Sequence, residues 1–246
     1  MSDDIAERLI VALDVPSVHE ASELVERLDG IVSFFKIGLW LLLAEGVENL
    51  IDGLVKSEKN VFLDCKMYDI GETVKQGVAR ARQRGVRFVT VHGDDQIMQA
   101  AVEGKGGSDH LKVLAVTVLT SLDDAALRQM GYALRLEELL ALRVRSAIAA
   151  GIDGIIAAPR DRPDEIRQRF ANERLIIATP GIRPRGTTKD DHRRAATPSV
   201  AVINGADYLI VGRPIIAAPD PERAAGAIIA EMRTADLQRR QSRPPG

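Results

Sequence analysis

Cysteine is almost absent from this chain, since its 246 residues include one, Cys65. A single thiol can form neither a disulfide framework nor a metal site built from several thiolates. An excess of charge of one sign is also lacking, because 33 Lys and Arg residues oppose 35 Asp and Glu residues, for a net charge of −2. Without a basic excess, the chain has no means of holding a nucleic-acid backbone as its main ligand.

Long apolar stretches are missing too. The longest unbroken apolar run, Leu39 to Ala44, is far short of the roughly 18 residues that a membrane span requires. The charged residues among positions 3–8 are Asp, Asp, Glu and Arg, and this start has no apolar core of the kind found in a signal peptide. We therefore expect a cytoplasmic protein that makes no membrane contact.

Short apolar runs rich in β-branched residues recur along the whole chain. Most of them lack strict alternation of apolar and polar residues, which is typical of strands buried on both faces of a parallel sheet. The predicted strands are Leu9–Val15, Phe34–Leu39, Val61–Met67, Phe88–Gly93, Val113–Thr120, Gly154–Ala158, Leu175–Ile182 and Tyr208–Ile215.

Helical patterns separate these runs. The first carries an apolar stripe from Val18 to Leu28, preceded by Ser17 and Glu20 in capping-box spacing. Asp220 and Pro221 fit the N-cap and first residue of the last helix. Glycines follow several helical runs, as expected for left-handed C-caps; they are Gly30, Gly85, Gly151 and Gly205. Eight β/α units in this length predict an α/β fold, a single-domain (β/α)8 TIM barrel over residues 1–237. Residues 238–246 lack periodicity, and we expect a disordered tail there.

Charged residues stand at the ends of the predicted strands, which is where a barrel places its active site. Asp14 follows the first strand, Lys36 lies in the second, and Asp64 and Lys66 end the third. Asp64 and Lys66 are two residues apart, so an extended strand would direct both to one face. For that pair alone, a structural salt bridge is an equally good explanation. Two acids and two bases at one end of the barrel favour a catalytic site.

Asp69 has two interpretations. It lies three residues beyond Lys66, and strand geometry alone does not bring it back to that lysine. With Glu72 it fits a capping box for a helix that starts near Ile70. Taken by itself, the segment favours the helix cap.

A Gly- and Pro-rich loop follows the seventh predicted strand. It includes Arg183, and Gly212 and Arg213 follow the eighth strand. Loops after strands seven and eight are the usual phosphate site of a barrel, where glycines leave the backbone open to an anion. Two ordinary turns with solvated arginines are the alternative, and the joint placement favours phosphate. The four histidines show no metal-ligand spacing, so we expect no metal.

These residues resemble the orotidine 5′-phosphate decarboxylase family. Asp64-Cys65-Lys66-Met67-Tyr68-Asp69-Ile70 matches its DxKxxDI signature, and the resemblance extends from Leu9 to Pro214. Its other blocks appear in the same order as Leu13-Asp14, Lys36-Ile37-Gly38, Val116-Thr117-Val118-Leu119-Thr120-Ser121, Thr179-Pro180-Gly181-Ile182-Arg183-Pro184 and Val211-Gly212-Arg213-Pro214.

The resemblance implies a homodimer that decarboxylates orotidine 5′-phosphate to uridine 5′-phosphate without any cofactor, the last step of de novo UMP biosynthesis. Protonated Lys66 would stabilise the carbanion at C6 and then protonate it. Asp64, Asp69 and Lys36 would complete the catalytic array. The implied substrate-binding residues are Asp14 and Lys36 for the ribose, Thr120 for the pyrimidine, and Gly212 and Arg213 for the phosphate, together with Arg183, His192, Ile70 and Thr73. Asp69, Ile70 and Thr73 would reach into the partner's site.

The chain departs from the family pattern at three places. Gly71 replaces the usual Pro after the signature, and Gly93-Asp94-Asp95-Gln96 replaces a segment of small residues and glycines after His92. His192 stands where the phosphate loop usually has Gln before paired arginines. Two alternatives stay open at this stage. One is a metal-dependent sugar-phosphate decarboxylase or epimerase, and the other is a non-catalytic nucleotide-binding barrel.

Overall fold

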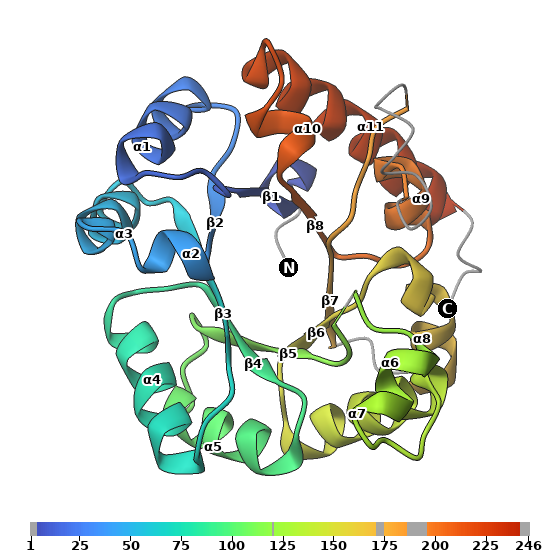
Figure 1. The fold of residues 1–246 in the computed structure, drawn as a ribbon. Coiled ribbons are helices and arrows are strands. Elements are labelled where there is room, and N and C mark those ends of the chain that lie inside the picture. Colours follow the sequence, from blue (N-terminus) through green and yellow to red (C-terminus); the bar gives the residue numbers. More distant parts are fainter. Residues whose placement is uncertain (1–3, 120, 171–174, 186–195, 242–246) are drawn as a thin grey trace. The chain divides into compact units, whose positions relative to one another are not determined.

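The structure, a computed structural model, describes residues 4–119, 121–170, 175–185 and 196–241. Its parallel strands form a closed barrel in sequence order, with helices alternating between them (Figure 1). The strands are β1 (Leu9–Ala12), β2 (Phe34–Gly38), β3 (Asn60–Met67), β4 (Phe88–His92), β5 (Lys112–Val116), β6 (Gly154–Ile156), β7 (Ile176–Thr179) and β8 (Tyr208–Val211). The predicted (β/α)8 class is therefore confirmed.

Helices follow the strands along the described chain. They are α1 (Val18–Arg27), α2 (Leu39–Leu42), α3 (Val47–Lys56), α4 (Gly71–Gln83), α5 (Asp95–Lys105), α6 (Asp124–Gln129), α7 (Leu136–Ala150), α8 (Pro163–Phe170), α9 (Pro198–Ile203), α10 (Arg213–Ile216) and α11 (Pro221–Gln241). Short 3-10 turns, η1 (Ile5–Arg8) and η2 (Pro159–Asp161), complete the described elements. Of the helices in the described ranges, none is both long and apolar enough to cross a membrane.

The chain divides into two compact units. The first contains residues 1–64 and 178–246, and the second contains residues 65–177, so the boundaries pass through β3 and β7. In the first unit β1 pairs with both β2 and β8, and β2 pairs with β3. In the second, β5 pairs with β4 and β6, and α4 and α5 lie side by side next to β4 (Figure 1).

Burial explains why the strands show little alternation. Every residue of β1, β2 and β8 is buried, as expected for parallel strands covered on both faces. Phe34 and Phe35 are adjacent on β2, and both are fully enclosed. The apolar runs that identified these strands are therefore the core of the first unit.

Several predicted element ends are confirmed. The Ser17 hydroxyl accepts a hydrogen bond from the Glu20 N–H at 3.2 Å, and Asp220 accepts one from the Arg223 N–H at 3.0 Å. The four glycines expected to end helices all have φ in the left-handed region, between 74° and 100°. Local capping chemistry thus fixes many of the helix boundaries.

Several boundaries differ from the sequence prediction, those of the eighth strand and the last helix among them. The eighth strand was expected to reach Ile215, but β8 ends at Val211 and α10 begins at Arg213. Pro214 has no N–H for a sheet and suits the first turn of a helix. The tail was expected to begin at 238, but α11 continues to Gln241. There the Arg240 side chain binds Asp236 one turn earlier at 2.8 Å.

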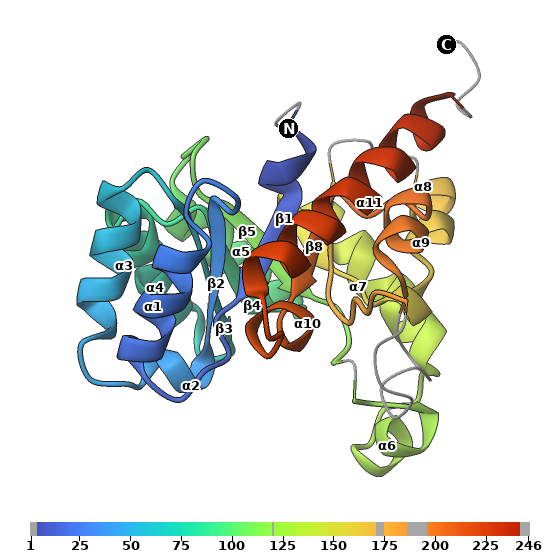
Figure 2. The same ribbon diagram turned by 90° about the horizontal axis from the view of Figure 1, so that it is seen from above.

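The base of the first unit is held by a buried ion pair. Arg8, just before β1, is 3% exposed and binds Asp236 of α11 at 2.8 Å. Its other nitrogens donate to the backbone oxygens of Asp207 and Ala206, at 2.6 and 3.2 Å. Helix α11 runs beside η1 and α9 (Figure 2), so this pair ties the last helix to the first strand. Burial disfavours the charged Asp236 carboxylate, yet Arg8 and Arg240 outweigh this and lower its pKa.

We predict that Asp236→Asn lowers the free energy of unfolding by about 3 kcal/mol at pH 7, because buried Arg8 loses its counter-charge. A lowered folded-state pKa gives stability that is present above the ordinary carboxyl pKa of 3.8 and is lost as the pH falls through the folded-state value. Urea denaturation at pH 7 and pH 3 should therefore show that the free energies of unfolding of Asp236→Asn and wild type differ less at pH 3 than at pH 7. Asp109→Asn, at an exposed position, is the control. An equal difference at both pH values would contradict the prediction.

Candidate active site

Lys36 is a buried ammonium group held between two carboxylates. It lies on β2, is 6% exposed, and places Nζ 3.0 Å from Asp14 Oδ1 and 3.5 Å from Asp64 Oδ2. Asp14 follows β1 and Asp64 lies on β3, so the two strands that flank β2 supply the acids. A buried charge is costly unless it is paired. The three residues that were predicted from strand ends in this unit therefore lie together.

Two glycines, Gly38 and Gly212, leave space for the Asp14 and Lys36 side chains. A Cβ on Gly38 would lie 3.0 Å from Asp14 Oδ1 and 3.1 Å from Lys36 Nζ. A Cβ on Gly212 would lie 3.5 Å from Asp14 Oδ2. Gly212 thus brings the backbone after β8 next to Asp14, and Arg213 follows as the first residue of α10. Gly212, which was predicted for the phosphate, is therefore a neighbour of Asp14, which was predicted for the ribose.

Arg183 of the same unit lies after β7. Its backbone N–H donates to the Ala196 oxygen at 2.9 Å, and its Nη1 donates to the Ile182 oxygen at 2.8 Å. A parallel β-bridge also pairs Ile182 with Ala196. Thr120 and His192, which the sequence also assigned to substrate, lie outside the described residues.

Lys66 has an unusual backbone for a residue with a side chain. It lies near the end of β3, in the second unit, and its φ is 46°. Its N–H donates to Thr90 Oγ1 at 2.9 Å, and its side chain is exposed. The same-face prediction for Asp64 and Lys66 assumed an extended strand, and the φ of Lys66 departs from that conformation although β3 continues to Met67. Strained non-glycine residues of this kind concentrate at functional sites.

The helix-cap interpretation of Asp69 is wrong. Ile70 is the N-cap of α4, and no side chain makes the capping hydrogen bond. Asp69 Oδ1 instead accepts from the adjacent Ile70 N–H at 2.7 Å, while Glu72 accepts from Gln76. Asp69, Ile70 and Thr73 are all exposed, Ile70 at 73%. The segment is therefore presented outward, and the cap does not account for Asp69.

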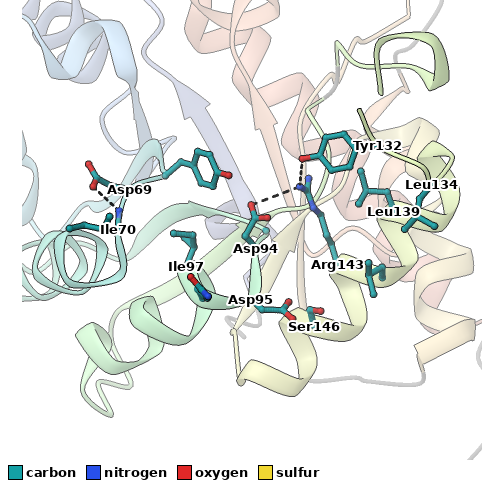
Figure 3. Close-up of a pocket in the computed structure, with 14 residues that line it drawn as sticks. Asp69, Ile70, Asp94, Asp95, Ile97, Tyr132, Leu134, Leu139, Arg143 and Ser146 are labelled. Carbon is teal, nitrogen blue, oxygen red and sulfur yellow. Dashed lines mark hydrogen bonds and ion pairs between the residues drawn. The ribbon is translucent and has the colours of Figure 1, made fainter. Parts of the chain in front are cut away.

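A pocket of about 730 Å³ lies beside this exposed segment. Its walls come from the loops after β3 and β4 and from α7, and Figure 3 shows Asp69 and Ile70 at one side with Arg143 and Tyr132 at the other. The lining residues are Tyr68, Asp69, Ile70, Gly93, Asp94, Asp95, Gln96, Ile97, Tyr132, Leu134, Leu139, Leu142, Arg143 and Ser146. Within the described ranges, no group of three or more His, Cys, Asp or Glu side chains could hold a metal ion.

Comparisons with known proteins agree with this geometry. A profile of the "Orotidine 5'-phosphate decarboxylase / HUMPS family" matches residues 7–228. The chain is 49% identical over 229 residues to a protein of Afipia carboxidovorans named orotidine 5′-phosphate decarboxylase, covering 93% of this chain and 96% of that one. A Caulobacter vibrioides protein of the same name is 48% identical over 227 residues, covering 92% and 97%. The chain belongs to this family.

A solved structure from the family has the same fold. The crystal structure of orotidine 5′-phosphate decarboxylase from Lactobacillus acidophilus aligns with a TM-score of 0.81 and 32% sequence identity. The alignment covers 92% of this chain and 99% of that one. The barrel fold is thus shared with that structure.

Sequence reasoning missed the role of Arg143 in the pocket wall. Arg143 is 7% exposed and lies on α7 among the buried positions Leu139, Leu140 and Val144. An arginine within the apolar stripe of a helix is the signal that could have identified it, because such a guanidinium needs partners inside the fold. Asp94, which the sequence marked only as a departure from the family pattern, lies 3.8 Å from it.

We predict that Gly38→Ala lowers the free energy of unfolding by about 1–2 kcal/mol, because the added methyl group displaces the Asp14 and Lys36 side chains from each other. Gly53→Ala on α3 is the matched control, since a Cβ there meets nothing within 4 Å. The control should be neutral or stabilising, as expected for glycine replaced by alanine inside a helix. Denaturant titrations of both variants check this. A Gly38→Ala protein as stable as the control would show that the Asp14 and Lys36 side chains can move aside without cost.

Proposed function

We propose that the chain converts orotidine 5′-phosphate to uridine 5′-phosphate and CO2, the last step of de novo UMP biosynthesis. Two relatives that carry the name of this enzyme match nearly the entire chain at 48–49% identity. The observation that carries the proposal is buried Lys36 paired with Asp14 and Asp64. The strained Lys66 follows Asp64 two residues later on β3. The two lysines among these four residues supply the positive charge that an anionic substrate needs when its reaction develops a further negative charge.

The chemistry requires a cation and a proton donor in one group. When the bond between C6 and the carboxylate breaks, CO2 leaves and the electron pair stays on C6. Protonated Lys66 stabilises that pair electrostatically and then transfers a proton from Nζ to C6, which completes the product. Water returns the proton to Lys66. Asp64 next to the substrate carboxylate adds repulsion that the departure of CO2 relieves.

Remote groups of the substrate supply the binding energy. In this proposal Asp14 and Lys36 bind the ribose hydroxyls, and Thr120 binds an edge of the pyrimidine. Gly212 and Arg213, with Arg183 and His192, serve the phosphate. The proximity of Gly212 to Asp14 supports a phosphate adjacent to the ribose. Binding of a distant phosphate can hold the ring for the chemical step.

The active site is shared between the two chains of a homodimer. Asp69, Ile70 and Thr73 of one chain enter the site of the other. Support comes from the exposure of these residues and from the absence of a capping role for Asp69. Tyr68 and Ile70 are large apolar side chains that are 67% and 73% exposed, and a partner surface would cover them.

A turnover assay tests the activity directly. Purified protein is mixed with orotidine 5′-phosphate, and the loss of the orotate chromophore is followed with and without a metal chelator. Turnover that survives the chelator supports the proposal. Activity abolished by the chelator would favour the metal-dependent sugar-phosphate enzymes. Tight binding of uridine 5′-phosphate without turnover would favour a non-catalytic barrel.

We predict that Lys66→Ala remains folded but loses nearly all turnover, since it removes the proton donor together with the adjacent cation. The strained φ of Lys66 adds a second expectation. Lys66→Gly should be equally inactive but about 1 kcal/mol more stable than Lys66→Ala, because glycine adopts this backbone without a steric penalty. Lys56→Ala, at an exposed position on α3, is the activity control. Substantial turnover by pure Lys66→Ala would refute the mechanism.

We predict that mixing Lys66→Ala with Asp69→Ala restores activity, although each variant alone is inactive. In a hybrid dimer one site combines the intact Lys66 of one chain with the intact Asp69 of the other, and the second site carries both defects. Activity should return to at most about half of wild type per hybrid dimer. Differently tagged chains and native mass spectrometry confirm subunit exchange. No recovery despite exchange would show that Asp69 serves its own chain.

A further inference from the structure

Arg143 connects three elements of the second unit. From α7, its Nη1 donates to the Thr117 backbone oxygen just after β5, and its Nη2 donates to the Tyr132 hydroxyl at 3.2 Å. Nη2 also lies 3.8 Å from Asp94 Oδ2 (Figure 3). The guanidinium is therefore fixed on several sides, which makes it a rigid anchor for Asp94.

Gly93 provides the space through which this arginine reaches Asp94. A Cβ at Gly93 would lie 2.8 Å from the Val116 oxygen and 3.2 Å from Arg143 Cδ. The backbone oxygen cannot yield as a flexible side chain would. A glycine at this position is thus required first by the Val116 backbone and then by the path of the Arg143 side chain.

Asp94 carries the connection onward to the loop after β3. Its Oδ2 lies 2.7 Å from His92 Nδ1, and the His92 ring packs against the Tyr68 ring with centroids 4.6 Å apart. Tyr68 directly precedes Asp69. Among the described residues, Asp69 itself hydrogen bonds only to the adjacent Ile70 N–H. Lateral support for the Asp69 backbone therefore comes through Tyr68.

We infer that Arg143, Asp94 and His92 form a positioning relay that sets the place of Tyr68 and, through it, of Asp69 and Ile70. These residues act through Asp69 and touch no substrate. The inference rests on the proposed role of Asp69 in a shared site. Asp94 of the relay belongs to the segment 93–96, where this chain departs from the small residues and glycines of the family pattern.

The relay makes a specific prediction for Asp94→Ala. Loss of the carboxylate frees His92 and Tyr68, and misplacement of a catalytic group by about 1 Å can cost on the order of 100-fold in rate. We expect kcat to fall about 10- to 100-fold while KM changes much less. Asp94→Asn keeps an acceptor for His92 and should recover part of kcat. It also serves as the test variant if Asp94→Ala fails to fold.

Arg143 offers a matched pair of variants. Arg143→Met should lower kcat in the same way as Asp94→Ala, whereas Arg145→Met, at an exposed position two residues further on α7, should not. Adding Asp94→Ala to Arg143→Met should lower kcat little further, because both changes break one network. Independent, multiplicative effects would overturn the relay.

Subunit mixing decides on which chain the relay acts. If it positions Asp69 for the partner's site, Asp94→Ala mixed with Lys66→Ala forms one intact site per hybrid dimer. Random exchange in an equal mixture then gives about one quarter of wild-type activity. Asp94→Ala mixed with Asp69→Ala should give no recovery. Failure of the first mixture, when Lys66→Ala and Asp69→Ala do complement each other, would overturn the relay and leave the shared site intact.

The double variant Asp69→Ala/Asp94→Ala tests the relay even if the active site is not shared between chains. If Lys66→Ala and Asp69→Ala fail to complement each other, the shared site is refuted, whereas the dependence of Asp69 on Asp94 can still be measured within one chain. In an Asp69→Ala background, adding Asp94→Ala should change the residual kcat by less than about twofold, since its effect passes through Asp69. A further fall of tenfold or more would show that Asp94 acts elsewhere, which overturns the relay.

Discussion

The burial of one ammonium group constrains the first unit of this protein. Lys36 lies on a strand with no solvated face, and a charge in such a place is tolerated only with partners of opposite sign. Asp14 and Asp64 meet that need from the two adjacent strands. The cluster is packed by three features of the backbone. The register of β1, β2 and β3 aligns the strands that carry or precede its residues. The absence of a side chain at Gly38 and the close approach of Gly212 leave space for it.

Much of the fold could be predicted because local and global signals agree. The apolar runs identify all the barrel strands, and capping residues such as Ser17 and Asp220 identify helix starts. The errors fall at strand ends, where apolar composition continues but sheet pairing stops. Composition cannot separate a last strand residue from a first loop residue. Near Pro214, the absence of a backbone N–H indicates the end of the strand better than apolar composition does. Helix α11 outlasts its apolar pattern because Arg239 and Arg240 bind neighbouring backbone and Asp236.

The candidate site was predictable where strand order alone brings residues together. Asp14, Lys36 and Asp64 belong to consecutive parallel strands, so their meeting requires no knowledge of loops. Asp69 could not be resolved in this way, since its spacing from Glu72 imitates a capping box that the backbone does not form. Arg143 and Asp94 are separated by 49 positions in the sequence, and only the packing of α7 beside the loop after β4 brings them into contact. The left-handed backbone of Lys66 could not be predicted, because nothing in the amino-acid composition around it indicates such a φ.

The segment from Lys66 to Ile70 shows how function and stability separate within a single strand and its loop. From Val61 to Leu63, β3 is apolar and buried, and burial of these residues stabilises the fold. Beyond Leu63, the chain has a lysine with a left-handed backbone and two large exposed side chains, Tyr68 and Ile70, and the strained backbone lowers the stability of the fold. Such a cost persists only if surrounding structure overdetermines the conformation. Thr90 bonded to the Lys66 N–H and His92 packed on Tyr68 provide that support from one neighbouring strand, β4. The rigidity of β4 therefore limits how accurately the segment from Lys66 to Ile70 is held.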